Sequence, residues 1–199
     1  MLIGENSRLS PHLKFGTVSA REVYHACKNT EFRKQLYWRD FYMQIGYHFP
    51  KVYGHNFRHT VKWSNNSTHF KKWCAGETGF DIVDACMAQL NKSGYMHNRG
   101  RMIVASFLTK ILHIDWRLGE QYFASRLTDY DPANNNGGWQ WSAGTGCDAQ
   151  PYYRIFNPYT QAAKFDPDGK YVKKWLSRPP TKEIVDYDKE RVYALKLIA

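Results

Sequence analysis

The segment 127–141, LTDYDPANNNGGWQW, gathers side chains that could hold a flat, polar molecule. Asp129 and Asp131 supply carboxylates, and the three asparagines that follow supply amide donors and acceptors. Two tryptophans spaced by two, Trp139 and Trp141, suit contact with a planar partner. The glycine pair before them allows close backbone approach or positive φ. Asp-Pro and Asn-Gly are also typical of an ordinary loop, but such a loop needs no indoles. We therefore interpret the segment as a binding loop.

A second concentration of chemistry lies at the start of a helix expected over about residues 98–112. Arg99 and Arg101 fall in its first turn, where the helix dipole disfavours positive charge. An ion pair to Asp129 or Asp131 would balance them, and so would a phosphate or a cofactor edge. Both can hold at once, because successive helix residues point about 100° apart and one arginine can face inward while the other faces outward.

Two weaker signals point to phosphate. The run Asn6-Ser-Arg-Leu-Ser10 precedes Pro11, with Ser10 expected as the helix N-cap. Hydroxyls and backbone amides there could cradle a phosphate, although simple capping explains them equally well. Arg39 lies in an aromatic mid-helix setting that suits a buried salt bridge or a diphosphate. The sequence shows no P-loop and no Ser-His-Asp or Cys-His arrangement, so hydrolytic and nucleotide-triphosphate chemistry are unsupported.

The remaining pattern predicts a single all-α domain over residues 1–199. Helical spacing or capping signals favour helices over about 10–15, 19–28, 31–49, 68–74, 81–90, 98–112, 115–127, 171–176 and 187–198. Residues 143–160 are expected to be mostly irregular, and we find no alternating strand pattern.

Composition narrows the class of partner. A net charge of +10 favours a polyanion, and an aromatic fraction of 16% interleaved with that charge favours nucleic acid or a flat cofactor. The four cysteines have no regular spacing, and Cys86 lies among apolar residues, so we expect reduced thiols and a buried Cys86. His55 and His59 lack a neighbouring acid, so no metal site is predicted. With no signal-peptide core and no membrane-spanning run, an intracellular protein, cytoplasmic or nuclear, is expected.

Six ordered motifs carry a resemblance. They are SRLSP (7–11), WRDF (38–41), residues 79–86, MHNRGRMIVASFL (96–108), DWRLGE (115–120) and residues 129–141. Together they resemble the photolyase/cryptochrome family, and most closely the class I cyclobutane pyrimidine dimer photolyases. The resemblance covers only the C-terminal helical FAD-binding domain of that family, without its N-terminal α/β antenna domain.

The resemblance implies FAD as cofactor and assigns its contacts. Asn6 to Ser10 would wrap the phosphates beside Arg39, although the family usually has Thr at the position of Asn6. Asp129 would pair with Arg101 beside the isoalloxazine, Asp131 would face the pyrimidine edge, and Asn135 would approach N5. The implied FAD-binding residues are Asn6, Ser7, Arg8, Leu9, Ser10, Phe32, Gln35, Arg39, Asn98, Arg101, Asp129, Tyr130, Asp131 and Asn135.

The resemblance also implies light-dependent repair of pyrimidine dimers in DNA. Trp139, Trp116 and Trp63 match the family's electron-transfer chain, although Trp116 would equally suit a core. The implied lesion and DNA contacts are Trp38, Asn98, Arg99, Met102, Trp141 and Arg154. Trp38 and Trp141 would wall a pocket for a dimer flipped out of the duplex.

Two departures keep alternatives open. Gln35 stands where dimer photolyases usually have glutamate, a position at which cryptochromes and (6-4) photolyases often carry glutamine. The antenna domain is also missing, so a separate N-terminal partner chain is one expectation. The alternatives are a repair enzyme, a flavin photoreceptor and a basic DNA-binding remnant without flavin. The residues implied for the cofactor and the lesion are intact. This argues against the remnant, because drift would be expected to alter such residues first.

Overall fold

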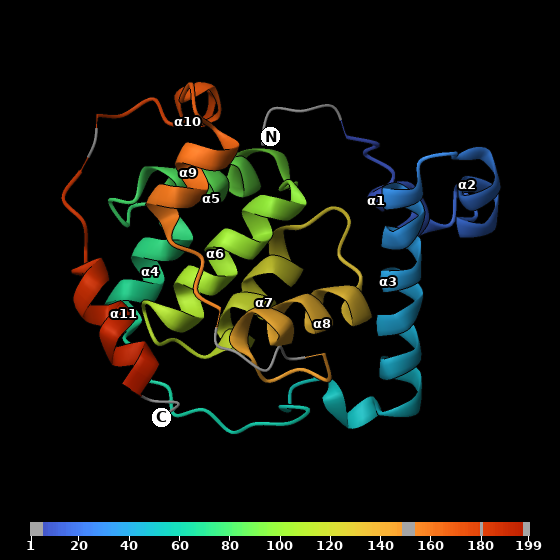
Figure 1. Cartoon of the computed structure of the whole chain (residues 1–199), viewed down its shortest axis with the longest axis horizontal. Helices are drawn as coiled ribbons and strands as arrows, with labels where there is room; N and C mark the ends of the chain where they lie inside the picture. The colour runs from blue at the N-terminus through green and yellow to red at the C-terminus, as the bar shows by residue number, and fades with distance from the viewer. Residues whose placement is uncertain (1–5, 149–153, 180, 197–199) are drawn as a thin grey trace.

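The computed structural model describes residues 6–148, 154–179 and 181–196, and within these ranges the chain is helical, with no strand (Figure 1). The elements are α1 (Ser10–Phe15), α2 (Ala20–Ala26), α3 (Thr30–His48), the 3₁₀ turn η1 (Pro50–Val52), α4 (Ser67–Ala75), α5 (Asp81–Ser93), α6 (Asn98–Lys110), α7 (Trp116–Arg126), α8 (Pro132–Ala143), α9 (Pro158–Phe165), α10 (Lys170–Trp175) and α11 (Tyr187–Lys196). The expected all-α class is confirmed. The start of the chain, where a signal peptide would begin, lies outside the described residues.

Helix α6 forms the centre of the core and contacts α5, α7, α8, α9 and α11 (Figure 1). Pairs of apolar residues recur along it every four positions, and Ile103, Val104, Phe107 and Leu108 are buried completely. Each such side chain contributes about 1.5–3 kcal/mol on burial. Cys86, on α5, is also fully buried, as expected.

Helix α3 stands at one side of the molecule, with α2 on its outer face (Figure 1). Asn29 caps its start by accepting from the backbone N–H of Phe32 over 3.0 Å, and Pro50 follows its end. Its contacts with the body run through α8 and η1. The cavities described below separate another face of α3 from α6.

Residues 132–141 of the segment interpreted as a binding loop lie in the helix α8, so the prediction of a loop there was wrong. Asp131 is its N-cap, accepting from the N–H of Asn134 over 2.9 Å, and Pro132 takes the first helical position. The helix has no continuous apolar stripe because its buried face mixes Trp139 and Ala143 with the polar residues Asn136, Gln140 and Ser142. Gln140 and Asn136 both donate side-chain amides to the carbonyl of Val52, over 3.1 and 3.2 Å.

The glycine pair of α8 serves close approach, since neither glycine has positive φ. A Cβ on Gly137 would collide with the ring of Tyr42 on α3, whereas a Cβ on Gly138 would meet nothing within 4 Å. Gly137 therefore lets α3 and α8 pack together, and Gly138 leaves open space beside the helix.

Two of the predicted local features differ in the structure. Leu9, not Ser10, occupies the N-cap of α1 and makes no side-chain cap. Residues 158–160, expected to be irregular, begin α9, which Asn157 caps through hydrogen bonds to two backbone amides. The terminal helix is present as α11, and residues 197–199 lie outside the described range. Among the described helices, none has the length and apolarity needed to cross a membrane.

Candidate functional site

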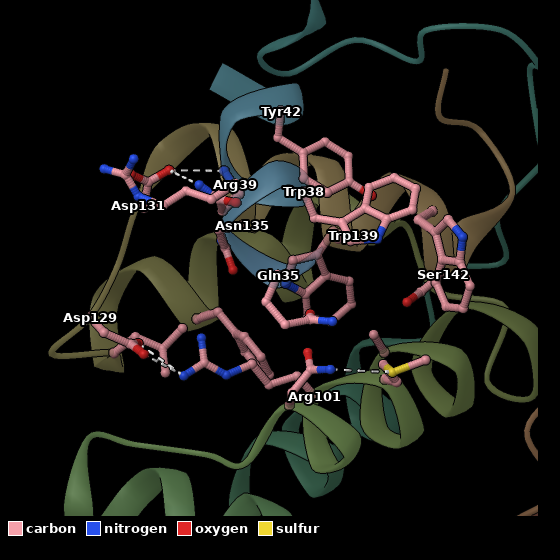
Figure 2. Close-up of a pocket in the computed structure, with 18 of the residues that line it drawn as sticks. Gln35, Trp38, Arg39, Tyr42, Arg101, Asp129, Asp131, Asn135, Trp139 and Ser142 are labelled. Carbon is pink, nitrogen blue, oxygen red and sulfur yellow. Dashed lines mark hydrogen bonds and ion pairs between the residues drawn. The ribbon is translucent and has the colours of Figure 1, made fainter. Parts of the chain in front are cut away.

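Two adjoining cavities lie between α3 and the body of the molecule. The first, here called the α8 cavity, has a volume of about 460 Å³ and lies among α3, α6 and α8 (Figure 2). The second, here called the N-terminal cavity, has about 510 Å³ and lies among residues 6–10, α3 and the start of α6. Both volumes are in the range of small-molecule sites. The cavities share Gln35, Arg39, Asn98, Arg101, Asp129, Asp131 and Asn134.

Most of the predicted site residues line these cavities. The N-terminal cavity receives Asn6, Ser7, Arg8, Leu9, Ser10 and Phe32 in addition to the shared residues. The α8 cavity receives Trp38, Met102, Asn135, Trp139 and Trp141. Positions up to 135 residues apart in sequence are thus brought to one continuous site.

Five predicted residues line neither cavity. Tyr130 turns its hydroxyl to Glu120 Oε1, at 3.4 Å. Trp116 is fully buried and donates its indole N–H to Asn56 Oδ1 over 2.8 Å. The others are Trp63, Arg99 and Arg154.

Arg101 and Asp129 form the charged pair between the two cavities (Figure 2). Arg101 Nη2 lies 2.7 and 3.0 Å from the two carboxylate oxygens of Asp129, whose side chain is 1% exposed. Arg101 Nε also donates to the carbonyl of Met96 over 2.8 Å. The predicted ion pair of a first-turn arginine is therefore present, and it fixes the guanidinium at the cavity wall.

The amides of α8 are held in definite orientations. Asn134 donates both its backbone N–H and its side-chain amide to Asp131 Oδ1, each over 2.9 Å. Asn135 donates its side-chain amide to Glu120 Oε1 over 3.0 Å. The polar atom that Asn135 leaves for the cavity is therefore its carbonyl oxygen.

The N-terminal cavity is closed by a tight turn over residues 6–9. Arg8 has a φ of 47°, and its backbone N–H donates to Asn6 Oδ1 over 3.1 Å. Tyr95 reaches the same Asn6 oxygen at 3.5 Å. Arg8, Arg39 and Arg101 all line this cavity, and three guanidinium groups suit an anionic ligand.

Aromatic side chains wall the other end of the α8 cavity (Figure 2). Trp38, 48% exposed, lies with its ring centroid 6.0 Å from that of Tyr42. The Tyr42 hydroxyl donates to Asp148 Oδ2 over 2.7 Å, and burial together with the Asp148 charge raises the pKa of Tyr42. This end offers an apolar slot with polar atoms at its edge.

Two arginines lie beside this slot. The guanidinium of Arg99 stands over the ring of Phe165 at 4.4 Å and over that of Phe156 at 5.9 Å. Partial burial and the charge of Arg154 lower the pKa of Arg99. Of the two first-turn arginines, Arg101 therefore faces the cavities and Arg99 faces away, as the helical spacing allowed.

Only the first of the three predicted electron-transfer tryptophans reaches the cavity. Trp139 is 2% exposed and packs edge-on against the buried Trp73, with centroids 6.0 Å apart. Gly119 on α7 makes room for its ring, because a Cβ there would collide with it. Trp63 is half-buried at the edge of the core.

Several lining residues were missed by the sequence analysis. In the α8 cavity they include Tyr42, Ser142 and Asp148, and in the N-terminal cavity Lys14, Leu36, Tyr95, Met96 and His97. Tyr42 follows Trp38 by four residues on one helix, a spacing that could have revealed it. His97 caps α6 by accepting the N–H of Arg99 on Nδ1 over 3.1 Å, a capping role rarely assigned to histidine.

The residues present fit an extended, anionic and aromatic cofactor such as FAD. Arg8 and Arg39 provide positive charge on one cavity, while Asp131, Asn135 and Arg101 provide donors and acceptors toward the other. The open space beside Gly138 leaves room for a flat ring against α8.

The family comparison points the same way. Residues 32–195 match the family described as the FAD binding domain of DNA photolyase. Curated relatives named deoxyribodipyrimidine photo-lyase include those of Halobacterium salinarum, 48% identical, and Vibrio cholerae, 50% identical. Each match covers 85% of this chain and 39% of the relative. The chain therefore spans well under half the length of these relatives.

Solved structures agree with this match. An archaeal photolyase from Sulfolobus tokodaii, crystallised with two FAD molecules, superposes with a TM-score of 0.93 at 43% identity, covering 98% of this chain and 50% of that one. A cryptochrome from Synechocystis superposes with a TM-score of 0.89 at 30% identity, over 96% of this chain and 48% of that one. The helical fold, the two joined cavities and these matches together show that the chain belongs to the photolyase/cryptochrome family, as an FAD-binding domain of the DNA photolyase type.

Proposed function

We propose that this chain binds FAD across the two cavities and serves light-dependent repair of cyclobutane pyrimidine dimers in DNA, with the features of a class I photolyase. The observation that carries the proposal is the continuity of the N-terminal cavity with the aromatic slot between Trp38 and Trp141. A cofactor held in the N-terminal cavity would therefore adjoin the apolar walls of the α8 cavity that could receive a flipped dimer. When bound and reduced, FAD supplies an electron to the dimer under light and recovers it once the cyclobutane ring has opened.

The chain's own residues have distinct parts in this proposal. The turn at residues 6–9 and Arg39 hold the diphosphate, and Arg101 and Asp131 orient the flavin ring. The carbonyl oxygen of Asn135, fixed by Glu120, accepts a hydrogen bond from a ring N–H. Trp38 and Trp141 exclude water from the flipped dimer, and Met102 and Asn98 form the floor beneath it. Arg99 and Arg154 bind the flanking phosphates.

Trp139, Trp116 and Trp63 are proposed to relay an electron to the flavin from the surface. Indole is readily oxidised. Trp139 lies at the cavity wall, Trp116 is fully buried and Trp63 is half-buried at the edge of the core.

A second part of the proposal concerns a partner. The match covers 39% of the Halobacterium salinarum relative, and the family resemblance implies an N-terminal antenna domain, which is the proposed partner of this helical domain. A flavin photoreceptor is the second candidate function, favoured by Gln35 at the cavity wall and by the match to the Synechocystis cryptochrome.

An absorption spectrum of the purified chain, followed by illumination with a thymine-dimer oligonucleotide, tests the proposal. Bound flavin with light-dependent loss of the dimer is the expected result. Flavin without repair would favour the photoreceptor. If no flavin binds even after an N-terminal photolyase domain is added, the proposed function is wrong and the chain is a remnant.

A further inference from the structure

The C-terminal half of α6 makes two hydrogen bonds to the backbone of residues 154–156. The backbone N–H of Phe156 donates to Ser106 Oγ over 3.2 Å, and Lys110 Nζ donates to the carbonyl of Arg154 over 2.7 Å. Ser106 and Lys110 are four residues apart and therefore share one face of the helix. A segment without helix or strand is thus fixed to the most buried helix of the fold.

Lys110 is an expensive choice for this position. The residue is 4% exposed, and burial together with the charge of Arg154 lowers the pKa of its ammonium group to about 8. An apolar side chain of similar size would avoid the cost of desolvating a cation. In return, the ammonium group of Lys110 donates a hydrogen bond to the backbone carbonyl of Arg154.

The segment 154–156 lies beside the aromatic slot. The ring of Phe156 packs against that of Trp141 with centroids 6.1 Å apart, and the guanidinium of Arg99 stands 5.9 Å from the Phe156 centroid. Trp141 lines the α8 cavity, and Arg154 is exposed. The place of this segment on α6 therefore sets the spacing of Arg99, Arg154 and Trp141.

We propose that Lys110, together with Ser106, is a positioning residue for DNA binding, which holds Arg154 at the phosphate-binding distance from Arg99 without touching DNA itself. The inference rests on the proposed function, since it assumes that the two arginines bind DNA. The charge of Arg154 lowers the pKa of both Arg99 and Lys110, so three cations lie near one another. A phosphate bound here would relieve the repulsion among them.

The test is the affinity of the purified chain for a fluorescent duplex carrying one thymine dimer, measured over a series of salt concentrations. Arg154→Ala removes a phosphate contact and should lower the slope of log K against log salt by about 0.9. Lys110→Met should weaken binding by about fivefold to tenfold. It should also lower the slope by as much as Arg154→Ala does, although Lys110 is buried and does not touch DNA. Ser106→Ala should weaken binding in the same direction.

Two further variants separate positioning from general destabilisation. Thr109→Val is the matched control, because Thr109 is also buried and its hydroxyl donates to the carbonyl of Ala105 in its own helix. This variant should bind as the parent does. The double variant Lys110→Met/Arg154→Ala should bind no more weakly than Arg154→Ala alone.

The outcomes distinguish the two proposals. A parent chain that fails to bind dimer DNA refutes the proposed function, and the positioning role falls with it. A parent that binds, with Lys110→Met matching Thr109→Val or adding fully to Arg154→Ala, refutes the positioning role alone. Should Lys110→Met fail to fold, Ser106→Ala decides the question by the same slope.

Discussion

The side chain of Asn135 donates to Glu120 twice, to Oε1 over 3.0 Å and to the backbone carbonyl over 3.2 Å. Both donor hydrogens of the amide are thereby committed to α7. Tyr130 supports the same carboxylate from 3.4 Å. Because Glu120 takes both N–H groups, Asn135 can only accept hydrogen bonds from the α8 cavity. Its role as an acceptor therefore depends on Glu120.

Asn135→Asp should therefore impair light-dependent repair by at least about tenfold while the fold is retained. The new carboxylate would face Glu120 at about 3 Å, where two like charges repel and the pair takes up a proton. Repair of a dimer oligonucleotide and circular dichroism of the same sample measure the two effects. Glu120→Gln added to Asn135→Asp restores a donor–acceptor pair, so the double variant should recover stability but not repair. Repair by Asn135→Asp at the parent's rate would remove Asn135 from the site.

Trp38→Ala should weaken binding of dimer-containing DNA more than binding of undamaged DNA. Aromatic stacking on a base contributes about 1–3 kcal/mol, and Trp38 lines the α8 cavity and is 48% exposed. Competition binding with the two duplexes gives the ratio directly. Tyr47→Ala is the control, since Tyr47 is 80% exposed on the same helix and lines neither cavity. Equal losses for the two duplexes would show that Trp38 does not read the lesion.

Asp129→Asn should lower the free energy of unfolding by about 1.5–3 kcal/mol, because it removes the charged acceptor of a buried hydrogen-bonded pair. Arg101 would then lose its fixed position, so FAD should also stabilise the variant less than it stabilises the parent. Urea denaturation with and without FAD measures both effects. Lys34→Gln, which breaks an ion pair whose side chains are 62% and 75% exposed, should change stability by less than about 0.5 kcal/mol. An equal effect of FAD on the parent and on Asp129→Asn would contradict the role of this pair.

Much of the site could be predicted from the sequence because its residues sit at recognisable helix ends. Spacing and charge alone predicted an ion pair between a first-turn arginine of α6 and Asp129 or Asp131, with one arginine inward and one outward. The family resemblance then implied Arg101 and Asp129 as the pair, which the structure contains. Helix α8 could not be found by periodicity, since its buried face carries Asn136 and Gln140, which bond to backbone carbonyls of a distant turn. Its cap, Asp131 before Pro132, was a signal that the asparagines and glycines obscured. The Lys110 contact with Arg154 was beyond any local pattern, because it joins residues 44 positions apart.

Acidification should destabilise the chain partly through His97. Burial and the neighbouring charges, Arg99 and Arg101 among them, lower its pKa below the usual 6.5, so the unfolded chain binds the proton more readily than the folded one. The free energy of unfolding should therefore fall as the pH drops from about 6.5 through the folded-state pKa, and protonation of Nδ1 would also remove the cap of α6. His97→Asn keeps a capping acceptor that does not titrate. The difference between the two stability profiles should be constant above about pH 7 and change as the pH falls below about 6.5. A difference that stays constant over the whole range would show that His97 does not titrate in this way.

Gly138→Ala offers the most direct test of where a flavin would lie. The position is helical and a Cβ there meets nothing within 4 Å, so alanine should raise the free energy of unfolding of the chain without cofactor by up to about 1 kcal/mol. The same methyl group would project into the space beside α8, so FAD affinity should fall severalfold. Thermal unfolding and a flavin-fluorescence titration measure the two effects. Gly137→Ala, which would collide with Tyr42, should instead destabilise the chain. A Gly138→Ala variant that gains stability and keeps the parent's FAD affinity would place the flavin away from this face of α8.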